Sequence, residues 1–440
     1  MPACAALVLA ASPAAAEDLL QVYRDAQRYD AVYAGARYAL DAGRERIPQA
    51  RALLLPSLNL SANATRQRIS SESKDPDVAP NLTFTRNPSN VGYTLTFSQP
   101  VYRPQSLVQR DQAEFQVRQA EATFAQASQD LAVRTAQAYF DVLAAQDTLA
   151  LVGAQKAAIS EQLAQAKRNF EVGTATITDT HEAQARYDLI VAQEIAAQND
   201  VDSKRRALQL VAGKEYSQLK PLRGDVRLSP PTPNDMQSWV DLAEKQSYPV
   251  LIQEAVSEVA QLEAKRARAG HLPTLDVVGT YGQTSQSAST VSSVGSDITS
   301  STIGLQLALP LYQGGGITSR EREAAANALK AREDLQNARR TSALTTRQTY
   351  LAVINGIAQV GALEQALTSS QSALDSNRLG YEVGVRINID VLNAQQQLFS
   401  TRRDLAVARY NAILNQLRLK AAAGSLREED LADVNRALQP

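Results

Sequence analysis

One stretch of this chain occurs twice. The segment FEVGTATITDTHEAQAR at residues 170–186 recurs, with substitutions, as YEVGVRINIDVLNAQQQ at residues 381–397. The two copies align without a gap, and Glu171 and Glu382 are separated by 211 positions. The other informative pairs at this spacing are Val172 and Val383, Gly173 and Gly384, and Asp179 and Asp390. A constant spacing between distant landmarks indicates a tandem duplication.

Further landmarks support this interpretation. They are Pro100 and Tyr102 with Pro310 and Tyr312, Pro56 with Pro273, and Gly213 with Gly424. The spacing drifts slightly among these pairs, which predicts loops of unequal length. The predicted organisation is a signal peptide at 1–16, a first repeat at 17–213, a linker at 214–239, a second repeat at 240–424 and a C-terminal tail at 425–440.

The composition limits which cellular compartment and which classes of partner are expected. The first residues, MPACAALVLAASPAAAEDLL, combine a short apolar stretch with Ala14 and Ala16 in the A-x-A pattern of a cleaved secretory signal. Cys4 is the single cysteine and lies in this segment, so we expect a mature chain without a disulfide. Lys and Arg (45) nearly balance Asp and Glu (46), which argues against a nucleic-acid partner. No apolar run approaches the length of about 18 residues that a membrane-spanning helix needs.

Two long segments have the period of a coiled coil. Residues 105–170 contain no proline, and apolar or alanine residues recur at steps of three, four and seven. About 65 residues of helix make a rod on the order of 100 Å long. Residues 317–381 match this pattern in the second half. We expect each rod to end at a turn and a shorter helix to return, at about 178–211 and 388–423.

Gly173 and Gly384 are the predicted tip turns of these helical hairpins, because glycine adopts the left-handed conformation that ends helices. The two tips are expected near 173–179 and 384–390. The repeated segment is therefore interpreted as the tip of a helical hairpin that is present twice.

Four short segments have a period of two instead. They form one pair at about 57–99 and a second at about 273–311, and each is predicted to be a strand of about ten residues with one apolar face. Strands of this length also suit a transmembrane barrel. The connections RQRISSESKDPDVAPNLTFTRNPS and QTSQSASTVSSVGSDITS are long and polar, as external barrel loops are. The fold class is thus mixed α and β, mostly α.

The strands of one chain do not close a barrel, since membrane barrels begin at about eight strands. Two copies of the chain would supply about eight strands, and three copies would supply about twelve and leave a bore. The residues alone favour an oligomer and leave both possibilities open.

The order of these elements, with FSQPVY and LYQGG after the strands and YEVGVRINIDVLNAQQQLF at the second tip, resembles the TolC family of outer-membrane efflux and secretion channels. The resemblance covers nearly the whole mature chain. It implies a homotrimer with a 12-stranded barrel in outer-membrane lipid, continuing into a long helical tunnel across the periplasm of a Gram-negative bacterium. Residues 214–239 would form the equatorial region. Partners implied are a periplasmic adaptor (membrane fusion) protein and an inner-membrane transporter of RND or ABC type.

The resemblance also assigns roles at the tips. It makes Thr178 and Asp179 on the first tip, with Tyr381 and Arg386 on the second, the gating links between the coiled coils. The positions at the pore constriction are then Asp390 and Asn393, and Asn393 departs from the family because many members have a second aspartate there. Periodicity alone would make Asp179 and Arg386 ordinary surface charges.

The sequence offers little for catalysis or cofactor binding. Its two histidines, His181 and His271, are not in a metal-ligand spacing, and no P-loop, G-x-S-x-G or dinucleotide-binding motif is present. We therefore expect a channel that is not an enzyme and has no cofactor and no metal. The alternative is a trimeric coiled-coil surface or periplasmic adaptor protein without a pore. The cargo, drugs and/or proteins, is not encoded in a recognisable pocket.

Overall fold

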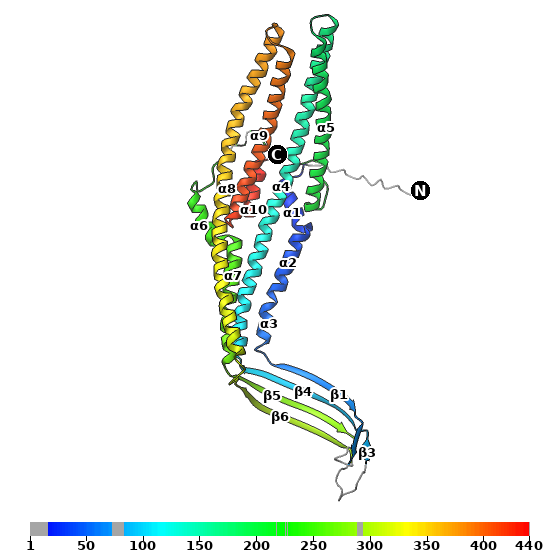
Figure 1. The fold of residues 1–440 in the computed structure, drawn as a ribbon, viewed down its shortest axis with the longest axis vertical. Coiled ribbons are helices and arrows are strands. Elements are labelled where there is room, and N and C mark those ends of the chain that lie inside the picture. Colours follow the sequence, from blue (N-terminus) through cyan, green and yellow to red (C-terminus); the bar gives the residue numbers. More distant parts are fainter. Residues whose placement is uncertain are drawn as a thin grey trace, which may run out of the picture. The chain divides into compact units, whose positions relative to one another are not determined.

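The structure is a computed structural model in which long helices accompany one larger sheet (Figure 1). It describes residues 16–72, 83–216, 218–224, 226, 228–287 and 294–439. The predicted signal peptide at 1–16, apart from its last residue, lies outside the described residues. None of the helices in the described ranges combines the length and the apolar character needed to cross a membrane.

The elements follow the predicted order in both halves. The first half forms α1 (Leu19–Tyr29), α2 (Ala31–Arg44), α3 (Arg46–Ala52), β1 (Ser57–Arg66), β2 (Ile69–Glu72), β3 (Thr83–Arg86), β4 (Ser89–Tyr102), α4 (Pro104–Glu171) and α5 (Ile177–Ala212). The second half forms α6 (Met236–Gln246), α7 (Tyr248–Arg268), a 3-10 turn (Ala269–His271), β5 (Thr274–Gln286), β6 (Ser296–Ala308), α8 (Gly316–Glu382), α9 (Asn388–Ala422) and α10 (Glu428–Arg436).

The chain divides into two compact units, and each of them draws on both halves of the sequence. The helical unit comprises Met1–Leu40, Glu121–Ile252 and Gln336–Pro440. The sheet unit comprises Asp41–Ala120 and Gln253–Leu335. The duplicated halves are therefore interleaved within each unit. The exact repeat boundaries proposed from the sequence stay a prediction.

In the helical unit the long helices pair as two hairpins, α4 with α5 and α8 with α9 (Figure 1). Leu163 and Ala166 of α4 pack on Ala183 of α5, and Val360 of α8 packs on Leu405 of α9. These contacts bury small and aliphatic side chains at heptad spacing, as coiled-coil packing requires. The helices begin and end within one or two residues of their predicted limits.

The first hairpin and α9 also share a core. Its members are buried around Tyr139 and Phe140 of α4 and include Tyr410 and Leu414 of α9. The Tyr410 hydroxyl donates to Oδ2 of Asp147 on α4 at 2.6 Å. Burial raises the pKa of Asp147 above its ordinary value, although the hydrogen bond from Tyr410 opposes this. This contact fixes α9 to α4 within the helical unit.

The sheet unit contains a four-stranded antiparallel sheet in the order β1-β4-β5-β6 (Figure 1). Leu60 lies opposite Leu95, and Leu95 lies opposite Tyr281. Directly opposite residues point to the same side, so this register gathers the apolar side chains on one face. That face carries Leu58, Leu60, Tyr93, Leu95, Phe97, Val277, Tyr281, Ile303 and Leu305. Within the chain it is largely exposed, with Ile303 at 83% and Leu305 at 72%.

The sheet corrects two details of the prediction. β1 has 10 residues, as expected, but β4 has 14 and β5 and β6 have 13 each. The first polar connection, predicted to be a loop, contains the two-stranded hairpin of β2 and β3. The extra strand length arises because ladder pairing continues through polar residues such as Thr284 and Ser285, which apolar alternation does not mark.

Candidate functional site

The first hairpin tip is closed by its own backbone and side chains. Gly173 has φ +77°, and its N–H donates to the Phe170 carbonyl, while the Thr174 N–H donates to the Asn169 carbonyl. This is the Schellman arrangement that terminates helices at a left-handed glycine. The return helix α5 then begins at a capping box. The Asp179 carboxylate accepts from both the N–H and the hydroxyl of Thr176, at 2.9 and 2.8 Å.

The second tip has the same backbone and different side chains. Gly384 has φ +79°, and its N–H and that of Val385 donate to the carbonyls of Tyr381 and Gly380. The N-cap of α9 is Ile387, which stands where the first tip has Thr176 and has no side-chain acceptor. Asp390 lies instead 3.7 Å from the guanidinium of Arg386.

The two equivalent aspartates therefore have different roles within one chain. Asp179 is engaged in capping its own helix, because a threonine precedes it by three residues. Asp390 is available to Arg386, because an isoleucine occupies that cap position. The pair Arg386 and Asp390 is partly exposed, at 60% and 34% of the side chains, so its contribution to stability is small.

Three contacts connect the second hairpin to the first near the tips. The Asn169 amide of α4 donates to the Tyr381 hydroxyl at 3.2 Å. Farther from the tip, Ile159 and Ile190 of the first hairpin pack on Leu392 of α9. Arg186 of α5 also donates to α9, to Oδ1 of Asn393 at 2.9 Å and to Oε1 of Gln396.

The predicted gating residues are only partly brought together. Within the described part of one chain, no hydrogen bond or ion pair joins Thr178 or Asp179 to Tyr381 or Arg386. Thr178 is exposed on the first turn of α5. The acceptor for Arg386 in the same chain is Asp390, and the donor to Tyr381 is Asn169. Links from these residues to a neighbouring copy stay a prediction.

Sequence reasoning missed Asn169, Arg186 and Gln396. The capping box was readable, since Thr176 and Asp179 stand three residues apart at a helix start. The partners of Arg186 could not be read from the sequence, because Asn393 and Gln396 lie 207 and 210 positions further along the chain. Only the packing of α5 against α9 brings these side chains into contact.

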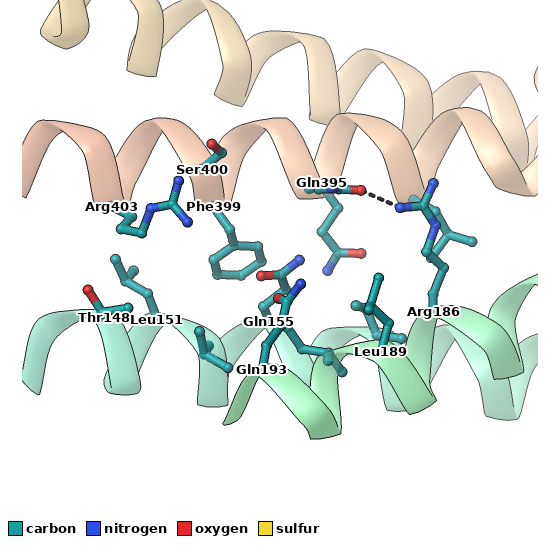
Figure 2. A pocket seen from close by; sticks show the side chains of 15 residues that line it. Thr148, Leu151, Gln155, Arg186, Leu189, Gln193, Gln395, Phe399, Ser400 and Arg403 are labelled. Carbon is teal, nitrogen blue, oxygen red and sulfur yellow. Dashed lines mark hydrogen bonds between the residues drawn. The ribbon is translucent and has the colours of Figure 1, made fainter. Parts of the chain in front are cut away.

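A cavity of about 200 Å³ lies between α4, α5 and α9 beside these contacts (Figure 2). Leu151 and Gln155 of α4, Leu189 of α5 and Phe399 of α9 contribute to its wall. Gln395 points into it from α9, is 2% exposed, and its Oε1 has no hydrogen-bond partner among the described atoms. The interface is therefore incompletely packed here.

The polar side chains near the tips connect helices to one another. Among the described residues, no group of three or more histidine, cysteine or acidic side chains is arranged to hold a metal ion. Its polar groups are amides, hydroxyls and exposed ion pairs that join helices. When such contacts form they hold the two hairpins together, and when they break the hairpins can separate.

Comparison with known proteins gives the family. The family model for "Outer membrane efflux protein" matches residues 22–214 and 239–425, one segment in each half. Outer membrane protein TolC of Vibrio cholerae is 34% identical over 436 residues, covering 99% of this chain and 97% of that protein. The proteases secretion protein PrtF of Dickeya chrysanthemi is 32% identical, covering 97% of this chain and 92% of that protein.

Solved structures show the same fold. The outer membrane protein VceC of Vibrio cholerae has a TM-score of 0.77 at 18% identity, covering 92% of this chain and 96% of that chain. CusC has a TM-score of 0.77 at 17% identity, covering 93% of this chain and 92% of that one. The fold class and the duplication predicted from the sequence are thereby confirmed. The chain is an outer-membrane protein that belongs to the outer membrane efflux protein family, the family of TolC.

Proposed function

We propose that three copies of this chain form a channel through the outer membrane and export drugs and/or proteins. The proposal rests on two properties of the four-stranded sheet, its exposed apolar face and its two outer strands. Its apolar face is exposed, and its outer strands β1 and β6 each pair on one side only within the described sheet. Unpaired edges favour pairing with another chain. Three four-stranded sheets joined edge to edge give a barrel of about twelve strands with an apolar exterior.

The cargo class follows from the relatives. TolC is an outer membrane protein, and PrtF is by its name a secretion protein for proteases, as is the alkaline protease secretion protein AprF of Pseudomonas aeruginosa. The matching family model is described as that of an outer membrane efflux protein. We infer that this channel works either in a tripartite efflux system or in type I secretion. Its partners are then a periplasmic adaptor and an inner-membrane transporter of RND or ABC type.

The hairpin tips are the proposed gate. The links are Thr178, Asp179, Tyr381 and Arg386, the constriction contains Asp390 and Asn393, and Gly173 and Gly384 form the turns. Exposed polar contacts support this role, because they are weak enough to break reversibly while the buried hairpin cores stay packed. Opening then consists of separating the second hairpin from the first at the tips.

Two measurements test the proposal. Detergent-extracted, cross-linked protein should run at three times the monomer mass, and trimers in planar bilayers should conduct. The double variant Tyr381→Phe, Arg386→Ser should conduct several-fold more than the wild type. A monomer in mild detergent, or trimers that never conduct, would refute the channel. The alternative, a coiled-coil adaptor without a pore, predicts that second outcome.

A further inference from the structure

Arg186 of α5 contacts two residues of α9. Its guanidinium donates to Oδ1 of Asn393 at 2.9 Å and to Oε1 of Gln396. The two acceptors are three positions apart and so lie on one face of α9. A planar guanidinium with several fixed donors can bind both at once. One side chain of the first hairpin thereby holds two consecutive turns of the second.

The acceptors are amides and carry no charge. Some arginines that connect helices in the helical unit contact carboxylates instead, as Arg409 contacts Glu364 at 2.7 Å and Arg134 contacts Asp30 at 3.1 Å. Arg402 and Arg418, like Arg186, donate to glutamine amides of a neighbouring helix. Hydrogen bonds from a charged donor to a neutral acceptor hold a geometry without the attraction of an ion pair. The connection made by Arg186 is therefore specific and weaker than an ion pair of equal geometry.

The packing behind this connection is incomplete. The cavity of about 200 Å³ separates Arg186 from the contact between Tyr410 and Asp147. Asn393 and Tyr410 are 17 positions apart on α9, or roughly 25 Å of helix. Side chains that line this partly open cavity have no protein atoms against them on the side that faces the cavity. Separating α9 from α5 over this length therefore breaks few packed contacts beyond that of Leu392 with Ile159 and Ile190.

We propose that Arg186 is a latch that positions α9 against the first hairpin, with the contact of Tyr410 and Asp147 as the fixed end. This inference rests on the proposed function, in which separation of the hairpins opens the channel. Releasing the two hydrogen bonds at Arg186 frees the part of α9 nearest the tip, while the contact of Tyr410 with Asp147 keeps the hairpins together.

The contact with Arg186 gives Asn393 a second role besides its predicted place at the constriction. Asn393 stands at the predicted constriction, yet its side-chain oxygen binds Arg186 of the same chain. An aspartate introduced there would meet a guanidinium within hydrogen-bond distance and form an ion pair. The variant Asn393→Asp should therefore lower conductance by strengthening the closed state. In the Arg186→Gln background, the same substitution should instead leave conductance no lower and increase block by a trivalent cation.

The direct test uses wild-type trimers and variants in planar bilayers. Arg186→Gln should raise conductance several-fold and leave thermal melting of the trimer unchanged. The pair Asn393→Ala, Gln396→Ala should give the same increase, and combining it with Arg186→Gln should add nothing further, because all three residues form one link. The matched control is Arg206→Gln on the same helix, since among the described residues Arg206 contacts only Gln209 of α5. That control should behave as the wild type.

The outcomes separate this inference from the proposed function. If Tyr381→Phe, Arg386→Ser opens the channel and Arg186→Gln does not, the latch is refuted and the channel stands. If no variant conducts, the proposed function fails. Loss of trimers in both Arg186→Gln and the alanine pair would also overturn the latch, because the contact would then serve folding. An additive triple variant would have the same consequence.

Discussion

A single arginine on the apolar face of the sheet should prevent assembly of the channel. Ile303 lies near the middle of β6, is 83% exposed, and faces Gly279 of β5 in the antiparallel register. Replacing it with arginine therefore displaces no packed side chain. The penalty comes from the surroundings alone, and for an arginine at the bilayer midplane of a barrel it is about 2 to 4 kcal/mol. With three copies in one barrel, the total is about 6 to 12 kcal/mol.

The neighbouring residue provides the control. Thr302 points to the opposite face, where its hydroxyl lies 2.5 Å from that of Thr280. Thr302→Arg loses this cross-strand contact, which contributes about 0.2 to 1 kcal/mol, and places the charge in the lumen. The assay is the yield and melting temperature of trimers from outer membranes. We expect Ile303→Arg to give almost no trimer and Thr302→Arg to give normal trimer. Equal behaviour of the two variants would refute the assignment of the faces.

Two further predictions concern stability. Asp30 is 5% exposed, caps α2 by accepting from the Tyr33 N–H at 2.7 Å, and binds Arg134; burial opposes its ionisation, but these hydrogen bonds prevail and lower its pKa. Asp30→Ala should lower the free energy of unfolding by about 2 to 3 kcal/mol. Because the folded-state pKa is lowered, this contribution is present above the ordinary aspartate pKa of about 3.9 and is lost as the pH falls through the folded value. Denaturant titrations at several pH values should show wild type and variant converging in acid, and a constant gap would contradict the assignment. Gly424 has φ +74°, and a Cβ there would clash with the Gln246 carbonyl oxygen, whereas Gly384 has φ +79° and open space around the position of a Cβ. Gly384→Ala should cost about 1 to 2 kcal/mol for the backbone alone, and Gly424→Ala distinctly more. Equal melting temperatures of these two variants would show that the clash at Gly424 relaxes.

The helices could be predicted from the sequence because their signals are local. A heptad pattern without proline fixes the course of α4, and a glycine with positive φ fixes where it ends. Both signals lie within the helix itself. The predicted ends of α8 and α9 were equally close for the same reason.

The sheet was predicted less completely. The apolar face could be recognised because Leu305 and its neighbours alternate with polar residues. The strands nevertheless continue into polar stretches, where ladder hydrogen bonds form without an apolar signal. The short hairpin of β2 and β3, with the sequences ISSE and TFTR, offers too few residues for a period of two to be recognised.

The tip contacts could be predicted least, because each depends on which side chain stands opposite. The sequence identifies Asp179 and Asp390 as equivalent, but their partners depend on Thr176 in one copy and Ile387 in the other. For Arg186, the acceptors belong to another hairpin, and their identity depends on the rotation of α9 about its axis. If α9 were rotated about its axis by the angle between two successive residues, it would present different side chains to α5.

The duplicated halves keep one contact pattern at their cores and differ at their tips. Tyr139 and Tyr350 are equivalent positions, 211 apart, and both are buried. Tyr139 donates to the Lys220 carbonyl at 2.8 Å, and Tyr350 donates to the Asn234 side chain at 2.9 Å, so each fixes the segment that joins the two halves. A buried hydroxyl that loses its partner costs about 1 to 3 kcal/mol, so divergence at these positions is expensive. The exposed tips carry no such penalty. There the two copies could acquire different side chains. In the first tip Asp179 caps its own helix, whereas in the second tip the equivalent Asp390 lies beside Arg386. Duplication thus supplies two equal rods, and divergence confined to their exposed ends supplies contacts that can break without unfolding them.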